Sequence, residues 1–134
     1  MVSGGWHYLD TSVAVHALLG HSAKAAAWIE AADRDESVDL VSSRILRTEL
    51  TRVLRREGIP VSERDRLLVG LSLVPLSEGI LQQAEAIVPH VKTLDAIHLA
   101  SALAIGRDPI VVTHDVTMDA VARELGLRTF DPVA

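Results

Sequence analysis

Short apolar runs alternate with longer stretches of helical periodicity along the chain. The runs are rich in β-branched or aromatic residues and are bounded by Gly, Pro, Ser or Asp, which is typical of buried strands. The clearest are W-H-Y-L, which ends at Asp10, and I-V-V-T, which ends at His114. The pattern predicts short strands at residues 6–9, 39–42, 73–76, 108–113 and 128–130.

The stretches between these runs have the apolar spacing and the end signals of helices. Ser22 and Thr93 are predicted N-caps, and Gly58 and Gly106 are predicted stops. Pro89 is expected to fray or end the helix that contains it. The predicted helices cover residues 12–19, 23–32, 44–57, 62–71, 77–90, 94–105 and 116–125.

Strands that alternate with helices need crossover connections, and such connections produce a parallel sheet that is covered on both faces. We therefore predict an α/β fold, a three-layer α/β/α sandwich whose central, mainly parallel sheet has about four to five short strands. The chain of 134 residues contains no linker, literal repeat or low-complexity tract, so we expect a single domain over residues 1–134. Residues in helices should far outnumber residues in strands.

The composition favours a packed globule in a reducing compartment. Hydrophobic residues make up 49% of the chain, and the sequence has no cysteine, which excludes disulfides and thiolate metal sites. The longest run without Asp, Glu, Lys or Arg, residues 11–23, is too short to span a bilayer. The N-terminus also lacks a signal-peptide pattern. We therefore expect a cytoplasmic protein without a membrane partner.

The net charge of −5 at first counts against a nucleic-acid partner, because proteins that bind phosphates are usually basic. The basic residues are unevenly distributed, however, and seven of the thirteen lie within residues 44–66. An acidic protein can still handle phosphates if bound divalent cations reverse the local sign of the charge. The charge balance therefore leaves a phosphate-containing substrate open.

Acidic side chains occur at four positions that surface solvation does not explain. Asp10 and Asp115 follow the two clearest strands, so both belong at the carboxyl edge of the sheet, where ligands of open α/β sheets bind. Glu49 borders the apolar stripe of its helix instead of facing away from it. Asp95 lies near a helix amino end, and these ends gather at the same edge.

Most of these residues also have an ordinary structural explanation. Asp115, taken alone, is better explained as the N-cap of the last helix, which would be worth about 1 kcal/mol. Asp95, taken alone, is equally well explained as a first-turn carboxylate that the helix dipole favours. Glu49 could pair with an arginine of its own helix, such as Arg52, on a wet face. Asp10 resists such an explanation, because a strand this apolar should be central and its end partly enclosed.

Carboxylates that share one pocket repel each other and resist desolvation, so the site is costly unless a cation lies among them. Oxygen ligands without Cys or a close pair of His favour magnesium or manganese over zinc. Such a cation binds phosphate oxygens and lowers the pKa of a bound water. The pattern therefore indicates hydrolysis of a phosphodiester.

Four motifs resemble a known family. They are L-D-T-S-V at residues 9–13, T-E-L at 48–50, L-D-A-I-H-L-A-S-A at 94–102 and V-T-H-D at 112–115. In order and spacing they are similar to those of the PIN-domain ribonucleases, specifically the VapC-type toxins of bacterial toxin–antitoxin pairs. L-D-A-I-H-L-A is the most specific of the four, and the likeness covers essentially the whole chain.

The resemblance implies an endoribonuclease whose acidic quartet holds magnesium or manganese. The four members would be Asp10, Glu49, Asp95 and Asp115. Glu49 would act mainly through water, and the products would carry a 5′-phosphate and a 3′-hydroxyl. Supporting polar groups near the metal would be Thr11, Ser12 and Thr113.

The resemblance also implies partners. It predicts a homodimer and a small VapB-type antitoxin whose tail fills the acidic groove. For the RNA substrate we favour phosphate contacts from Arg47, Arg52 or Arg55, although a charged helix face is usually only solvated. The chain departs from many relatives a few positions beyond the fourth aspartate, where Met118 and Asp119 stand in place of an aromatic residue. Asp119 lies one helical turn from Asp115 and is a fifth candidate ligand, although a solvated residue on the helix surface explains its position more simply.

Two other functional classes remain to be compared with the nuclease. D-T-S after a first strand also occurs in aspartate-nucleophile phosphatases, but these need an aspartate where this chain has Ser12. The non-enzymatic alternative is an α/β interaction module or receiver-like switch in which the carboxylates are only helix caps. The sequence has no phosphate-binding G-x-x-x-x-G-K-[ST] loop, G-x-G-x-x-G turn or G-x-S-x-G elbow, so nucleotide binding by those devices and serine hydrolysis lack support.

Overall fold

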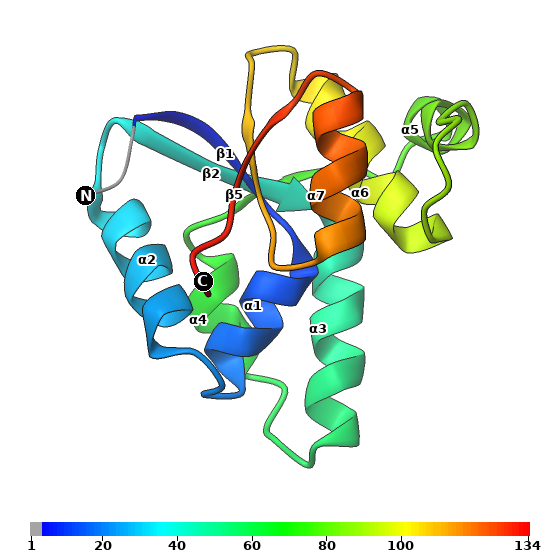
Figure 1. Cartoon of the computed structure of the whole chain (residues 1–134). Helices are drawn as coiled ribbons and strands as arrows, with labels where there is room; N and C mark the ends of the chain where they lie inside the picture. The colour runs from blue at the N-terminus through cyan, green and yellow to red at the C-terminus, as the bar shows by residue number, and fades with distance from the viewer. Residues whose placement is uncertain (1–3) are drawn as a thin grey trace.

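A computed structural model describes residues 4–134 and contains a parallel sheet of five strands in the order β3-β2-β1-β4-β5 (Figure 1). Every predicted strand is present. The bounds are β1 Gly5–Leu9, β2 Val38–Ser43, β3 Ser72–Val74, β4 Ile110–Val112 and β5 Arg128–Phe130.

Two strands are shorter than the sequence predicts. β3 ends before Pro75, which has no N–H to donate to a neighbouring strand. β4 begins only at Ile110, because Asp108 has a left-handed backbone with φ 49° and Pro109 follows it. Both differences have a local backbone cause, and neither changes the topology.

β1 is central because it pairs with β2 on one side and with β4 on the other. Leu9 lies opposite Val112, and the N–H of Asp10 extends this ladder by donating to the Val112 carbonyl at 2.9 Å. The register therefore brings the carboxyl ends of β1 and β4 to one edge of the sheet. The residues that follow these two ends, Asp10 and Thr113, are neighbours for this reason.

The helices agree with the prediction in number and order. They are α1 Thr11–Leu18, α2 Ala23–Arg34, α3 Arg44–Arg56, α4 Glu63–Leu68, α5 Glu78–Glu85, α6 Thr93–Ile105 and α7 Val116–Glu124. The hydroxyls of Ser22, Ser43 and Ser77 accept hydrogen bonds as N-caps of α2, α3 and α5. None of these helices, within the described chain, is long and apolar enough to cross a bilayer.

Three predictions about helix ends were wrong. α4 ends at Leu68 instead of near residue 71. The N-cap of α6 is Lys92, and Thr93 is the first helical residue. α5 ends at Glu85 instead of near His90, because the chain leaves the helix before Pro89 and packs Ile87 and Val91 against the main core.

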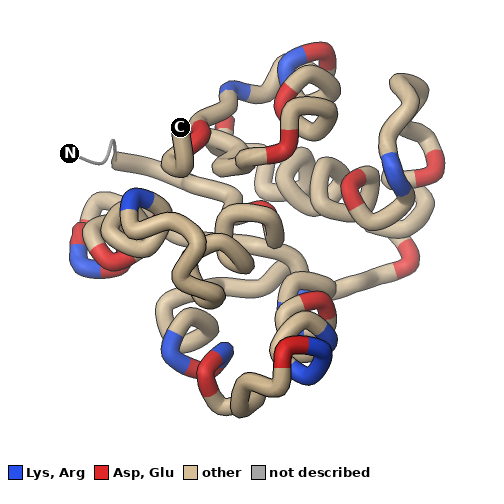
Figure 2. Tube along the Cα trace, turned by 60° about the horizontal axis from the view of Figure 1, so that its bottom comes forward, with Lys and Arg blue, Asp and Glu red and all other residues tan. Residues whose placement is uncertain are grey.

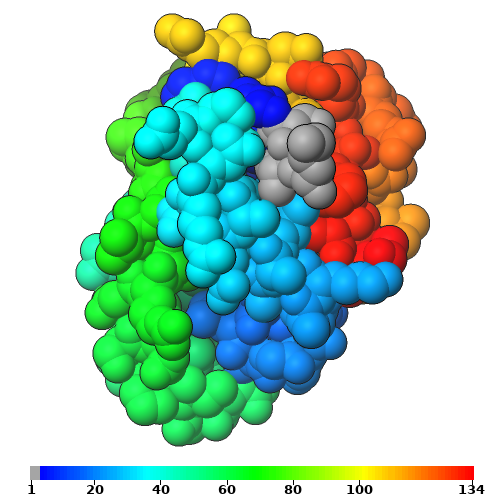
Figure 3. Space-filling model, turned by 90° about the vertical axis from the view of Figure 1, so that its left-hand side faces the viewer, coloured from blue at the N-terminus to red at the C-terminus, as the bar shows by residue number. Residues whose placement is uncertain are grey.

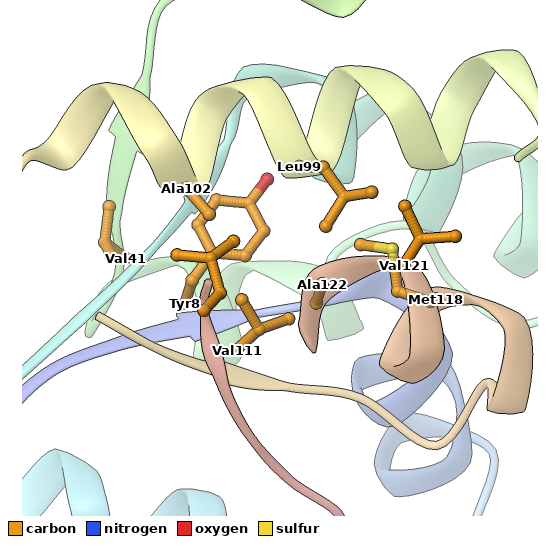
Figure 4. Close-up of a cluster of buried hydrophobic side chains, with 9 residues drawn as sticks. Tyr8, Val41, Leu99, Ala102, Val111, Met118, Val121 and Ala122 are labelled. Carbon is orange, nitrogen blue, oxygen red and sulfur yellow. The ribbon is translucent and has the colours of Figure 1, made fainter. Parts of the chain in front are cut away.

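The two faces of the sheet carry separate apolar cores. Tyr8 and Val111 pack with Leu99 of α6 and Met118 of α7 on one face (Figure 4). Their chain neighbours point to the other face, because side chains alternate along a strand. On that face Leu9 and Val112 pack with residues of α1, α2 and α3.

The resulting three-layer α/β/α arrangement is the predicted fold. Figure 3 shows α1 and α2, in blue and cyan, as a continuous cover between the green segment that includes α4 and the red C-terminal segment. Helices on both faces leave the carboxyl edge of the sheet to the connecting loops and helix amino ends. The candidate site lies at this edge.

Candidate active site

Asp10 is anchored through one of its two carboxylate oxygens. It occupies the N-cap position of α1 but makes no side-chain capping bond. Its Oδ2 instead accepts hydrogen bonds from the hydroxyls of Ser12 and Thr113, each at 2.8 Å. The side chain is almost fully buried, and the hydrogen bonds fix its orientation. Oδ1 accepts no hydrogen bond from the described chain, and Nε2 of His98 lies 3.9 Å from it.

Glu49 is held in the same way from α3. Its Oε1 accepts hydrogen bonds from the Thr11 hydroxyl at 2.7 Å and from Nε2 of His98 at 2.8 Å. No salt bridge joins Glu49 to Arg52 or Arg56 within residues 4–134. The wet ion pair that the sequence left open is therefore not formed, and the carboxylate faces the end of β1 with 21% of its side chain exposed.

Asp115 is the N-cap of α7, as its position predicts. Its Oδ1 accepts a hydrogen bond from the Met118 N–H at 2.8 Å, and its own N–H donates to the Thr113 hydroxyl at 3.1 Å. Because Thr113 also donates to Asp10, this one hydroxyl links the two aspartates. The cap occupies a single oxygen, so capping and a second role for Oδ2 are compatible.

Asp95 has an electrostatic environment that reveals the convergence of the four carboxylates. The residue lies half-buried in the first turn of α6. Burial, followed by the negative charges of Asp10 and Asp115, raises the pKa of Asp95 to about 6, with a further rise from Glu49 and an opposing effect from His98. The charges of the other three acidic residues therefore act on Asp95, although the four come from widely separated parts of the chain.

Tyr8 and His98 complete the site, and sequence reasoning missed Tyr8. The Tyr8 ring rises from β1 toward α6, as Figure 4 shows, and its hydroxyl lies 2.6 Å from Nδ1 of His98. His98 is fully buried and is hydrogen-bonded through both ring nitrogens. The only available signal for Tyr8 was an aromatic hydroxyl two residues before Asp10 on a buried strand.

The hydrogen bonds of His98 link Tyr8 to Glu49. Burial raises the pKa of Tyr8 above its ordinary value, so the hydroxyl that lies against Nδ1 of His98 keeps its proton. On the other side of the ring, Nε2 donates to the Glu49 carboxylate. The buried imidazole therefore holds Glu49 in place.

Two neighbouring residues take part in other contacts. Asp119, the fifth candidate ligand, forms an ion pair with Arg123 at 3.2 Å, which agrees with the plainer explanation of a helix-surface residue. His114 donates from Nδ1 to the Asp131 carboxylate at 2.9 Å, and its ring packs edge-on against the ring of His16. The three arginines that the sequence suggests for RNA binding line a cleft between α3 and α4. These residues, Arg47, Arg52 and Arg55, do not contact the carboxylates.

The donor set suits a hard cation that keeps much of its water. Three carboxylates have one oxygen anchored by the protein and a second oxygen available, and hard cations prefer oxygen ligands. Within residues 4–134, no group of three or more His, Cys, Asp or Glu side chains is arranged to coordinate a metal ion directly. Mg²⁺ is usually bound through one or two carboxylates and several waters, so this spacing fits such an ion better than a fully dehydrated one.

The raised pKa of Asp95 predicts an unusual pH dependence in the metal-free protein. An unfolded chain releases the Asp95 proton near pH 4, whereas the folded chain holds it to about pH 6. The free energy of unfolding should therefore fall as the pH rises through this interval. Asp95→Asn should remove the fall and stabilise the protein at pH 7 by about 1–2 kcal/mol, once solvent screening is allowed for. Chemical denaturation in chelator at several pH values measures both effects, and a variant less stable than the parent at pH 7 would contradict them.

The Tyr8–His98 contact predicts a second stability effect. Tyr8→Phe keeps the buried ring but removes the hydroxyl that hydrogen-bonds with Nδ1 of His98, so the free energy of unfolding should fall by about 1–3 kcal/mol. Guanidinium denaturation measures the loss. A Tyr8→Phe variant as stable as the parent would show that this contact does not stabilise the fold.

Comparisons with known proteins agree with the fold and show the family. The PIN domain family model matches residues 7–124, a range that contains all four carboxylates. Ribonuclease VapC47 of Mycobacterium tuberculosis (strain CDC 1551 / Oshkosh) is 38% identical over 133 residues, which cover 95% of this chain and 97% of the relative. Ribonuclease VapC46 of Mycobacterium tuberculosis (strain ATCC 25618 / H37Rv) is 35% identical over 95 residues, or 69% of this chain and 73% of the relative.

The fold is similar to that of a solved complex, VapBC2 from Rickettsia felis bound to a DNA fragment from its promoter. The TM-score is 0.72 at 16% identity, and the match covers 95% of this chain and 98% of that chain. An identity this low supports the likeness of fold alone. The family match over most of the chain and the likeness to VapC47 go further: the chain belongs to the PIN-domain family, among its VapC-type ribonucleases.

Proposed function

We propose that the protein is a metal-dependent endoribonuclease that serves as the toxin of a toxin–antitoxin pair. The observation that carries the proposal is the meeting of Asp10, Glu49, Asp95 and Asp115 at one edge of the sheet. The names of the two relatives support RNA as the substrate. The likeness to the VapBC2 complex supports the pairing with an antitoxin.

Magnesium or manganese is the cation that the donor set would hold. Asp10 through Oδ1, Asp115 through Oδ2 and the Asp95 carboxylate would be its ligands, while Glu49 would act through water. When bound, the ion supplies a water of lowered pKa and neutralises charge on the phosphate. It would also remove the repulsion that raises the pKa of Asp95.

The residues around Glu49 give it the role of a base. Thr11 and His98 hold Oε1, so Oε2 is the atom left to orient a water and accept its proton. The water oxygen forms a bond to phosphorus, and the bond from phosphorus to the ribose 3′ oxygen breaks. The 3′ oxygen takes up a proton, so the products are a 5′-phosphate and a 3′-hydroxyl.

The alternative functions explain fewer of the contacts. In a module whose carboxylates only cap helices, Asp10 should cap α1, but its side chain turns to Ser12 and Thr113. A phosphatase would need an acid where Ser12 stands, and here the Ser12 hydroxyl donates to Asp10. Neither alternative accounts for a glutamate held by a buried histidine.

The proposal includes two protein partners. We expect a small VapB-type antitoxin that blocks the acidic edge of the sheet, and a second copy of this chain in a homodimer. The surface has room for protein contacts, since Val88 is 92% exposed and lines an apolar groove of about 430 Å³ between α5 and α6. Light scattering of the purified chain, alone and co-expressed with its antitoxin, measures both assemblies.

The catalytic proposal predicts cleavage of RNA that depends on the divalent cation. The purified protein should cut total RNA in magnesium and be inactive in chelator. Asp95→Asn should lack activity, and Glu49→Gln should lose about 10²- to 10⁴-fold in kcat through the missing base. Denaturing gels of end-labelled RNA measure the rates, and 5′-end analysis identifies the phosphate.

Asp39→Asn is the matched control for these substitutions. Asp39 is exposed near the start of β2, at the opposite end of the strand from the acidic edge, so its loss should leave the rate unchanged. If Asp95→Asn cuts RNA as fast as the parent chain, the acidic quartet is not the active site.

A further inference from the structure

Arginines gather on the surface of this acidic protein at a cleft between α3 and α4. The cleft has a volume of about 370 Å³. Figure 2 shows the basic positions of these two helices as blue segments on the lower part of the molecule. The arginines that line the cleft are Arg44, Arg47, Arg52, Arg55 and Arg64.

Most of these arginines have no acidic partner. Arg64 contacts Asp65 at 3.4 Å, but the other four form no salt bridge with any residue of the described chain, 4–134. Cations gathered without counter-charges repel one another, and a bound polyanion relieves this repulsion.

Threonine hydroxyls position two of the guanidinium groups. Arg44 donates to the Thr48 hydroxyl at 3.1 Å, and Arg64 donates to the Thr51 hydroxyl across the gap between α3 and α4. Each guanidinium has five N–H donors, so these contacts leave most of them free. The planar fork of arginine suits the oxygens of a phosphate group, which it can bind through two parallel hydrogen bonds.

The cleft and the candidate active site share one helix, α3. Glu49 lies in the second turn of α3, and the helix rises about 1.5 Å per residue, so Arg52 and Arg55 lie about 4.5 Å and 9 Å farther along its axis. The carboxylate site itself is negative and can hold RNA only at the phosphate that meets the cation. Neighbouring phosphates of the strand need positive charge within a few ångströms, and this helix carries it.

We propose that the α3–α4 arginine cleft binds the sugar–phosphate backbone of single-stranded RNA next to the cleavage point. The inference rests on the proposed function, because it assigns a second binding site to the same substrate. Contacts of this kind do not read the base sequence. The cleft therefore sets affinity and the direction of the strand, while the acidic edge carries out the chemistry.

The test measures RNA binding in chelator, where no cleavage occurs. The probe is a fluorescent single-stranded RNA of about ten nucleotides, a length within the range that single-strand binding sites occupy. The variant is Arg52→Gln with Arg55→Gln, and its matched control is Lys24→Gln with Arg34→Gln, which removes the same charge from exposed positions of α2. Affinity is measured over a series of salt concentrations.

Log affinity falls linearly with log salt concentration, and the slope of this line should be shallower for the cleft variant than for the parent. The difference should be about 0.7 for each phosphate that the variant no longer binds. The control variant should keep the slope of the parent. Equal slopes in the cleft variant and the parent, or no binding by the parent at low salt, would overturn the inference. Competition by polyglutamate with an unchanged RNA slope would assign the cleft to an acidic protein partner and would also overturn it. Magnesium-dependent cleavage by the parent is scored separately, so the proposed function can stand if this inference fails.

Discussion

The cost of enclosing several carboxylates in one site is the constraint on which the site depends. Burial, together with the negative charges of Asp10 and Asp115, raises the pKa of Asp95 to about 6. The fold tolerates this group of carboxylates because hydroxyl, amide and imidazole groups donate hydrogen bonds to one oxygen of each residue that neighbours Asp95. The remaining oxygens stay available to a cation.

The sheet makes this arrangement stable. Asp10 and Thr113 are neighbours because β1 and β4 pair in parallel register and end at the same edge. The second layer of contacts comes from α6, whose His98 reaches from beside Asp95 to Glu49 and Tyr8. A change in register by one residue would turn Tyr8 away from α6, and Nδ1 of His98 would lose the Tyr8 hydroxyl as its hydrogen-bond partner. Core packing and site geometry therefore depend on the same strand.

The sequence predicted the elements well because strand and helix signals here are local. Asp10 and Asp115 could be assigned to one edge because carboxyl ends of parallel strands meet there. The Tyr8–His98–Glu49 chain could not be predicted, since it depends on which faces of β1, α3 and α6 come together in space. The early end of α5 has the same origin, because burial of Ile87 and Val91 outweighs helix propensity.

The most direct test of this shared carboxylate site is the pKa of Asp95 itself, measured by carbon-detected NMR titration of the carboxyl group. In chelator the pKa should be about 6, and in saturating magnesium it should fall well below that value, because the cation replaces the repulsion of the neighbouring carboxylates. A pKa near the ordinary value of about 3.9 in chelator, unmoved by magnesium, would mean that these side chains do not share one site.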